Sequence, residues 1–324
     1  MVQERAAPLD ALRRLSLRRL AAVPALLLLA NAFGYLYASL ARWVRASDAS
    51  SFSAFLKETV AAYWVYLQGV ARLDFGTLPH GRGPASEAVL SVLPNSLGLL
   101  ALAFLISSVL GLVLGLQSAR TNPPSVNPWL TPVSTLGMAM PSFYVGTLSF
   151  TLLIFFILRG WPRPSLPFFG TGWDRHLVLP LVALCLRPTA QIALISARLL
   201  ADELRKPYVT AARSAGQTWF RIRWRSALRN IAAPVTIALL ASLRLLIGEL
   251  LVVEWVFQWR GVGRLLAEAF IPPRLTTEQA RALFLDPVLV AFLLMVVTLL
   301  FLLTDLAGRL LIPRLDPRLR AAEG

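Results

Sequence analysis

The side chains that could perform covalent or metal chemistry are few in this chain. It holds two histidines, His80 and His176, and one cysteine, Cys185. A lone cysteine cannot form a disulfide or a cysteine-based metal site within one chain, and two histidines exclude a histidine-rich metal centre. A membrane-embedded enzyme would need a serine beside a histidine, or paired aspartates. Both histidines lie in predicted loops and Asp305 is the only aspartate in a predicted apolar span, so we predict no metal site and no catalytic residue.

Charged side chains inside long apolar runs form a second group. Arg187, Arg244 and Glu249 lie in such runs. A charge at the centre of a membrane costs about 2.5–3.5 kcal/mol on insertion scales, so each needs a partner or water. Arg244 and Glu249 are roughly 140° apart around one helix, so we predict that Arg187 pairs with Glu249 across two helices. Such a pair either lines a polar translocation path or is purely structural, and the sequence favours neither reading.

A dense cluster of cations between two apolar runs is the third group. The segment 206–230, KPYVTAARSAGQTWFRIRWRSALRN, carries six cations and no acid. Pro207 suits the first turn of a helix, where its missing N–H costs nothing, and Gly216 can end that helix because glycine accepts left-handed backbone angles. We therefore predict a short helix over 208–215. Its small residues would form a smooth ridge that another protein surface can approach closely.

The residues after Gly216 alternate strictly between apolar and basic. FRIRWR taken alone favours a strand. At a membrane edge we prefer a helix whose arginine stems reach outward while Phe220, Ile222 and Trp224 stay in the interface. A positively charged membrane loop would explain the charge alone. It would not explain a proline-initiated, glycine-closed helix in a loop of roughly 30 residues, because connections are commonly shorter.

The composition places these residues in a membrane protein. Of 324 residues, 56% are hydrophobic and 15% are charged, whereas soluble domains carry about 25% charged residues. The net charge of +15 sits between apolar runs, which indicates loops facing an anionic membrane side and argues against a nucleic acid partner. A spanning helix needs about 20 mostly apolar residues. The runs that qualify are Leu20–Leu40, Pro94–Leu116, Leu130–Leu158, Leu177–Leu200, Leu228–Phe257 and Pro287–Ile312.

Two of these runs allow a second interpretation. The basic stretch RRLSLRR precedes the first run, as in a signal peptide, but an apolar run of about 20 residues exceeds the usual 7–15, so we predict a retained helix. Pro141 interrupts the third run. It either shapes a gate beside Ser142 or produces a harmless kink whose freed backbone groups are satisfied by neighbours, and we favour the kink.

Arginine and lysine accumulate in the N-terminal tail, between the fourth and fifth runs, and in the C-terminal tail. With six spans these three regions share one face, which the distribution of positive charge assigns to the cytoplasm. We therefore predict an all-α polytopic membrane fold with six transmembrane helices and both termini cytoplasmic. Its parts are an N-terminal tail over 1–19, a first helix over 20–42, an external region over 43–93, a transmembrane core over 94–312 with a cytoplasmic loop over 201–227, and a tail over 313–324.

The external region contains one further helical pattern. SSFSAFLKETVAAYWVYLQGVARL, residues 51–73, places apolar side chains at helical spacing. This predicts either an amphipathic helix lying on the outer membrane surface or a small packed cap on the outer loops.

The cationic loop resembles the cytoplasmic EAA loop of ABC importer permeases, in the variant of the dipeptide, oligopeptide and nickel class. Thr210 stands where that pattern has glutamate, while Ala211, Ala212 and Gly216 match it, and ALRN at 227–230 matches the end of the loop. Other motifs resemble the same class in order and spacing. They are GVARLDFG at 69–76, PASEAVLSVLPNSLGL at 84–99, MPSFYVG at 140–146, VVEWVFQWRGVGRLL at 252–266 and LDPRLR at 315–320.

The resemblance runs over residues 65–320 and points to the B-type membrane subunit of such importers. The chain departs from the class at several positions. Arg260 replaces the proline of W-P-G, Arg309 stands where an acid is usual, and residues 41–62 lack the A-P-G-D-P stretch common after the first span. The external region is therefore expected to differ from that of the class.

The resemblance implies a permease in the cell (inner) membrane whose ATP hydrolysis is done by partner chains. This sequence has no G-x-x-x-x-G-K-[ST] phosphate loop, so we expect no cofactor here, with ATP and Mg bound by the partners. The expected partners are a second permease, two ATP-binding subunits, an extracytoplasmic substrate-binding protein and membrane lipid. The expected ATPase-coupling helix consists of Tyr208, Thr210, Ala211, Ala212, Arg213, Ala215 and Gly216. The expected translocation path or gate consists of Ser142, Arg187, Arg244, Glu249 and Glu254.

Peptide is the expected cargo, with nickel or another small solute of the same class as an alternative. With two histidines, one cysteine and four methionines, we expect any metal cargo to be bound by the external protein. A secondary transporter driven by ions is a further alternative, but such proteins often show inverted repeats, and we find none. A noncatalytic assembly subunit is the last alternative.

Overall fold

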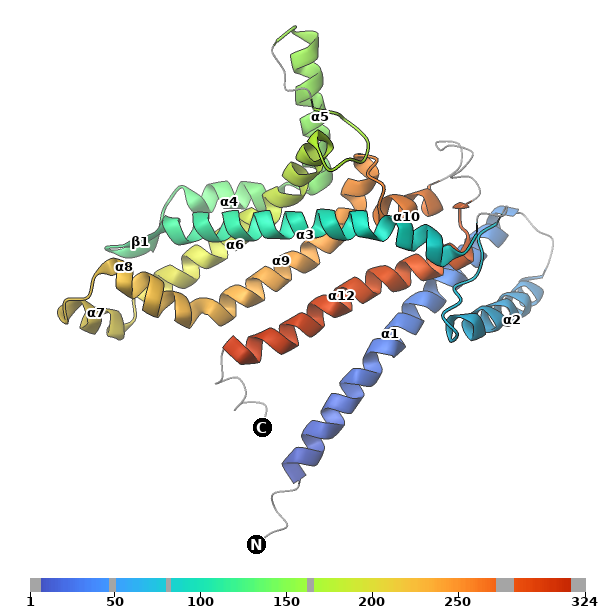
Figure 1. Ribbon diagram of the computed structural model, residues 1–324, viewed down its shortest axis with the longest axis horizontal. Coiled ribbons are helices and arrows are strands. Elements are labelled where there is room, and N and C mark those ends of the chain that lie inside the picture. The colour runs from blue at the N-terminus through green and yellow to red at the C-terminus, as the bar shows by residue number, and fades with distance from the viewer. Residues whose placement is uncertain (1–6, 47–50, 80–82, 162–165, 272–282, 316–324) are drawn as a thin grey trace. The chain divides into compact units, whose positions relative to one another are not determined.

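The computed structural model describes residues 7–46, 51–79, 83–161, 166–271 and 283–315, and these are almost entirely helical (Figure 1). His80 and most of the LDPRLR motif lie outside the described residues. The long helices are α1 Ala7–Ala46, α2 Phe52–Val70, α3 Ala85–Ser118, α5 Ser142–Leu158, α6 Val178–Leu204, α9 Leu228–Val256 and α12 Pro287–Leu315. The short elements are β1 Ala119–Thr121, β2 Pro124–Val126, α4 Leu130–Ala139, η1 Arg175–Leu177, α7 Pro207–Ser214, α8 Trp219–Arg221, η2 Ile222–Ala227 and α10 Val262–Phe270.

The described residues contain five helices long and apolar enough to cross a membrane, or six spans if the bent pair α4 and α5 counts as one. The five are Ala22–Arg45, Ala85–Ser118, Arg175–Leu204, Trp219–Val256 and Pro287–Ile312. Each overlaps one predicted run, and most extend beyond it because the helices continue into polar turns that a count of apolar residues leaves out. The predicted all-α polytopic class is confirmed. The assignment of loops to membrane faces, and with it the domain boundaries, stays a prediction.

The chain divides into two compact units, described one at a time. The first comprises Met1–Asn95 and Arg260–Leu303, and the second comprises Ser96–Trp259 with the residues from Thr304 onward.

In the first unit, α2 is attached to α1 through a polar and aromatic contact. The Asn31 side-chain N–H donates to the Tyr66 hydroxyl at 3.0 Å, and the Tyr63 hydroxyl donates to the Asn31 oxygen at 3.2 Å. The ring of Tyr35 stacks on Tyr66 with centroids 5.3 Å apart. The buried Asn31 of α1 is thereby satisfied by two tyrosines, which is what a buried amide requires.

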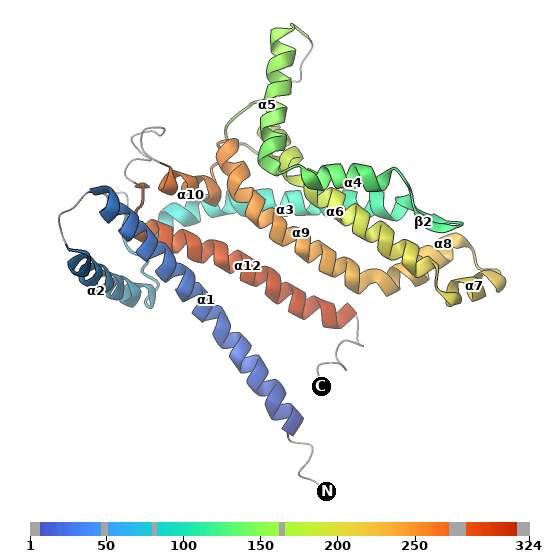
Figure 2. The same ribbon diagram turned by 180° about the vertical axis from the view of Figure 1, so that it is seen from behind.

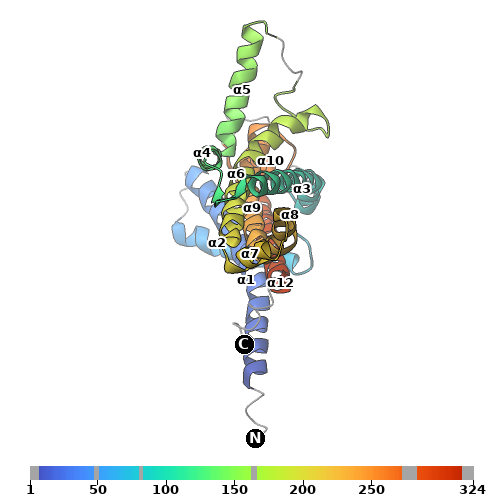
Figure 3. The same ribbon diagram turned by 90° about the vertical axis from the view of Figure 1, so that its left-hand side faces the viewer.

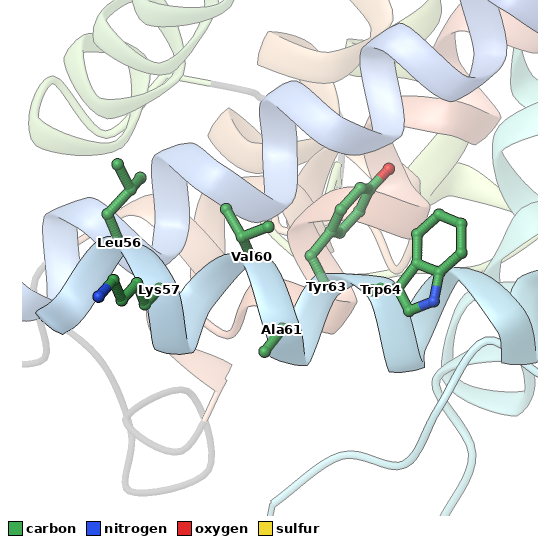
Figure 4. Close-up of a pocket in the computed structure, with 6 residues that line it drawn as sticks. All are labelled: Leu56, Lys57, Val60, Ala61, Tyr63 and Trp64. Carbon is green, nitrogen blue, oxygen red and sulfur yellow. The ribbon is translucent and has the colours of Figure 1, made fainter. Parts of the chain in front are cut away.

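The helical pattern expected over residues 51–73 is confirmed by α2. Ser51 caps its start, accepting a hydrogen bond from the Ala54 N–H at 3.3 Å. Leu56, Val60 and Trp64 lie along one side of the helix, where they are exposed and line an apolar depression (Figure 4). The two alternatives for this helix, a position on the outer membrane surface and a packed cap on the outer loops, both stay predictions.

In the second unit, α6 lies alongside α9 and α4 lies alongside α6 (Figures 1 and 2). Helix α3 reaches α6 through two glycines four residues apart, a spacing that lets helix backbones approach closely in membranes. A Cβ at Gly115 would stand 2.4 Å from the backbone oxygen of Ala193, and one at Gly111 would stand 2.7 Å from the Ile192 Cβ. The two glycines therefore set the distance between α3 and α6.

The expectation of a harmless kink at Pro141 is wrong. Helices α4 and α5 are separate and make an angle of 93°. In Figure 3, α4 is seen nearly end-on while α5 is seen along its length. Met140 is extended, with φ −94° and ψ 107°, because the residue before a proline is pushed out of the α region. The run 130–158 is thus a bent pair, not one straight span. Ser142, the first residue of α5, is buried at this corner.

One short hairpin stands between α3 and α4. Strands β1 and β2 pair antiparallel, with Arg120 opposite Ser125. The sequence did not predict it, since three-residue strands carry no alternating pattern that can be read.

The close packing of α3 on α6 yields a stability prediction. Gly115→Ala would force a methyl group into the Ala193 backbone, and overpacking of this kind costs about 1–3 kcal/mol. We expect a lower thermal unfolding temperature for the purified variant in detergent. The matched control is Gly248→Ala in α9, where a Cβ would meet nothing within 4 Å. Equal unfolding temperatures for the two variants would contradict this account of the contact.

Candidate functional site: the cationic loop and the buried ion pairs

Helix α7 begins and ends as its sequence predicts. Lys206 is extended, with ψ 147°, and Pro207 occupies the first turn. At the other end Gly216 has φ +80°, a conformation that glycine adopts without a steric penalty. The Gln217 N–H donates to the Ala212 carbonyl and the Gly216 N–H to the Arg213 carbonyl, both at 3.0 Å. These two bonds form a Schellman motif, which satisfies the last carbonyls of the helix.

The inner side of α7 is seated on the ends of longer helices. Val209 is buried in a cluster with Leu116 of α3, Leu204 of α6 and Ile231 of α9. Tyr208 and Ala212 are partly buried against the same cluster. The other predicted coupling residues are exposed: Thr210, Ala211, Arg213, Ala215 and Gly216. Of the predicted coupling residues, Tyr208 and Ala212 therefore face the interior. The others form an exposed surface of small side chains that carries one cation, Arg213.

Arg213 fastens the segment that follows α7. Its guanidinium donates to the Gln217 carbonyl at 2.7 Å and lies 4.9 Å from the ring centroid of Trp219. Thr218 then caps α8, accepting from the Arg221 N–H at 3.3 Å. The turn after Gly216 is consequently fixed at both of its ends.

The alternating FRIRWR segment is helical, as predicted, but part of it has π-helical hydrogen bonding. Ile222–Ala227 form the π-helix η2, and such turns are frequent at functional sites. Phe220 and Trp224 are exposed, whereas Ile222 is fully buried. The prediction that Ile222 stays in the interface is wrong, because that side chain packs into the apolar cluster around Val209.

A buried carboxylate joins three segments at the start of α7. Glu203, in the last turn of α6, is 4% exposed. Its Oε1 accepts from the Tyr208 hydroxyl at 3.0 Å and from the Asn230 side-chain N–H at 2.8 Å, and its Oε2 lies 2.6 Å from the Lys206 ammonium. Burial, followed by the bond to Glu203, raises the pKa of Tyr208 to about 12. The sequence showed Glu203 only as one acid among many cations.

Near the same end of α6, Arg205 connects to the hairpin. Its Nε donates to the Pro124 carbonyl at 3.1 Å. The hairpin thereby shares its attachment point with the cationic loop.

The predicted pair between Arg187 and Glu249 is confirmed. The Arg187 guanidinium of α6 lies 2.8 Å from Oε1 of Glu249 on α9. Ser142, at the corner before α5, interacts with the same carboxylate. The second oxygen, Oε2, is buried with no hydrogen-bond partner among the described residues. Three residues chosen from sequence thus meet at one polar site, and it retains an unused acceptor.

The remaining two path residues lie elsewhere. Arg244 of α9 forms an ion pair with Asp305 of α12, and their side chains are 49% and 43% exposed. Glu254 is fully buried near the end of α9. A role of Glu254 in a gate stays a prediction.

Titratable side chains outside these contacts are the remaining candidates for a metal or catalytic arrangement. No group of three metal-ligating side chains comes together within the described part of the chain. His176 lies in the turn η1 and bonds Asp174 at 2.6 Å, which holds the pKa of that carboxyl below its ordinary value.

Comparison with known proteins supplies an independent finding. Residues 107–317 match the family described as binding-protein-dependent transport system inner membrane component. A Brucella abortus protein whose name refers to a peptide transport system permease is 29% identical over 238 residues, 72% of this chain and 75% of its own. The oligopeptide transport system permease AppB of Bacillus subtilis is 27% identical, covering 64% and 67%. The glutathione transport system permease GsiC of Salmonella choleraesuis is 30% identical, covering 64% and 66%.

The ion pair between α6 and α9 yields a second stability prediction. Arg187→Met leaves the Glu249 carboxylate with no charged partner, which costs about 1–3 kcal/mol or more when the group is buried. We expect a lower unfolding temperature for this variant and a recovery in the double variant Arg187→Met, Glu249→Gln, measured by thermal unfolding of the purified protein. A double variant no more stable than Arg187→Met would show that the two side chains are not energetically coupled.

Proposed function

Because the chain belongs to the family of binding-protein-dependent transport system inner membrane components, we propose that its cationic loop couples ATP hydrolysis on partner subunits to peptide import. The chain is a multi-pass membrane protein and the permease subunit of an ABC importer of the peptide class. Members of this family are membrane subunits, and the ATPase is a separate subunit. The remaining question is how this chain receives the motion of that ATPase.

The observation that supports the proposal is the construction of α7. It is a short helix fixed at both ends, buried along Val209 and exposed along Thr210, Ala211 and Arg213. Small exposed side chains let a partner surface approach closely, and Arg213 adds a single cation for an acidic residue of that partner. A membrane loop that only carried positive charge would need neither the capped ends nor the buried attachment.

The proposed assembly contains two permeases, two ATP-binding subunits and an extracytoplasmic substrate-binding protein. ATP and Mg bind to the partner ATPases, and both termini of this chain are cytoplasmic. Closure of the ATPase pair pushes on α7. The push reaches α6 and α9 through the cluster around Val209. It shifts the bundle between an outward-open and an inward-open state, because binding of nucleotide to the ATPases favours one of these states over the other.

The proposed path is polar at two places. Charges in a membrane interior face a bundle interior or a water-filled cavity. The site formed by Ser142, Arg187 and Glu249 joins α5, α6 and α9 through one ion pair, and we assign it to the path because of its charge. The half-exposed pair of Arg244 and Asp305 is unsuited to lipid tails, so we assign it to the surface that meets the second permease or the path.

Peptide is the proposed cargo. The three relatives above carry names that refer to peptide, oligopeptide and glutathione transport, and all three names describe peptides. The deciding experiment is uptake of labelled peptides and of Ni²⁺ by the transporter reconstituted with its own partner subunits. ATP-dependent uptake of Ni²⁺ without peptide uptake would replace this proposal with the nickel alternative.

The role of α7 predicts the effect of one substitution. Gly216→Val places a β-branched residue at φ +80°, where a side chain costs roughly 1–2 kcal/mol, and would unwind the end of α7 without a steric clash. We expect ATP hydrolysis to persist while peptide uptake per ATP falls. Both rates are measured on the reconstituted transporter.

The matched control is Gly160→Val. Gly160 has φ +64°, closes α5 with the same pair of backbone bonds and also meets nothing within 4 Å. It carries the same backbone strain at a helix end remote in sequence from the loop. Wild-type uptake per ATP in Gly216→Val, or an equal loss in Gly160→Val, would contradict the coupling role of α7.

A further inference from the structure

We propose that Glu203 is a positioning residue that locks α7 to the ends of α6 and α9, so that a push on α7 moves those two helices together. The donors of its three contacts come from three places. Lys206 directly precedes α7, Tyr208 lies in the first turn of α7, and Asn230 lies in the first turn of α9. Only the coupling part of this proposal rests on the proposed function.

Burying the Glu203 carboxylate costs free energy that its contacts must offset. A carboxylate 4% exposed loses its hydration and is tolerated only when paired and hydrogen-bonded. It also lies in the last turn of α6, where the helix dipole disfavours a negative charge. Helix α6 would therefore gain from a neutral residue here, so the benefit must come from the segments that the carboxylate joins.

The hydrogen bonds of Glu203 give α7 a fixed orientation that its apolar packing alone does not provide. Val209 holds the inner side of the helix by apolar burial, which is not directional. Hydrogen bonds from Tyr208 and Asn230 to one oxygen fix direction and register. The Tyr208 hydroxyl is protonated at neutral pH, as tyrosine ordinarily is, and therefore donates to the carboxylate. Without the carboxylate, α7 keeps its apolar contact and loses its fixed orientation.

The test compares Glu203→Gln with Asp202→Asn. Glutamine keeps the shape of the side chain, but it is neutral and its amide would face the Lys206 ammonium. Asp202 is the adjacent acid, 72% exposed and 3.6 Å from Arg205, so its variant removes the same charge one residue away. The assembled transporter, purified with its own partner subunits, is used for hydrogen exchange of residues 207–217 and for uptake per ATP.

We expect Glu203→Gln to speed amide exchange in α7 by about tenfold, the order of effect for one lost charge-assisted hydrogen bond, and to lower peptide uptake per ATP. Asp202→Asn should change neither quantity. Unchanged exchange in Glu203→Gln, or an equal change in Asp202→Asn, would overturn the claim that Glu203 holds α7 in place. Faster exchange with normal uptake per ATP would overturn the claim that this attachment transmits movement to α6 and α9.

Two further variants keep the outcomes separable. If Glu203→Gln does not assemble, Tyr208→Phe replaces it, because this variant removes one donor and keeps the ring. We expect amide exchange in α7 to become faster, but by less than in Glu203→Gln. No increase would overturn the proposal that Glu203 holds α7 in place. Gly216→Val serves as the reference for the proposed function. If it and Glu203→Gln both leave uptake per ATP unchanged, the coupling role of α7 fails, while the exchange data still decide whether Glu203 holds the helix.

Discussion

The cost of leaving a charge without a partner among apolar helices governs this structure. Arg187 meets Glu249 across α6 and α9, Arg244 meets Asp305 across α9 and α12, and Glu203 collects three donors. The two ion pairs join helices about 60 residues apart in sequence, and Glu203 joins neighbouring donors to Asn230, which lies 27 residues further on. Apolar burial alone would allow these helices to rotate or slide, because it is non-directional. The charged contacts add the fixed geometry that transmission of a movement requires.

The same constraint explains why the cationic loop is more than a source of positive charge. Its arginines make the loop basic, but α7 is held by Val209 in an apolar cluster and by Glu203 in a polar one. The Schellman closure at Gly216 and the contact of Arg213 with Trp219 fix the far end. A helix held in this way transfers a force applied to its exposed residues instead of absorbing it by bending.

Sequence reasoning predicted the parts of the fold that depend on local rules. The apolar spans, the start of α7 at Pro207 and its end at Gly216 follow from hydropathy and backbone preference, and the partner of Glu249 followed from the cost of an isolated charge. What it missed depends on side-chain contacts that the order of residue types does not show. The approach of Gly115 to Ala193, the burial of Ile222 and the three donors of Glu203 leave no periodic signal. The break at Pro141 was visible, but its 93° size is set by how α4 and α5 pack.

The central claim is that the exposed side of α7 contacts an ATPase subunit on the cytoplasmic face. Ala211→Cys gives an exposed thiol on that side, and the one native cysteine, Cys185, is buried and so contributes little background. The most direct measurement is cross-linking of this thiol, through a photoactivatable maleimide, in membranes that contain the whole transporter. We predict a product with the ATPase subunit whose yield changes when ATP is added. Labelling of the introduced thiol by a membrane-impermeant maleimide from outside intact cells, without that product, would contradict the account.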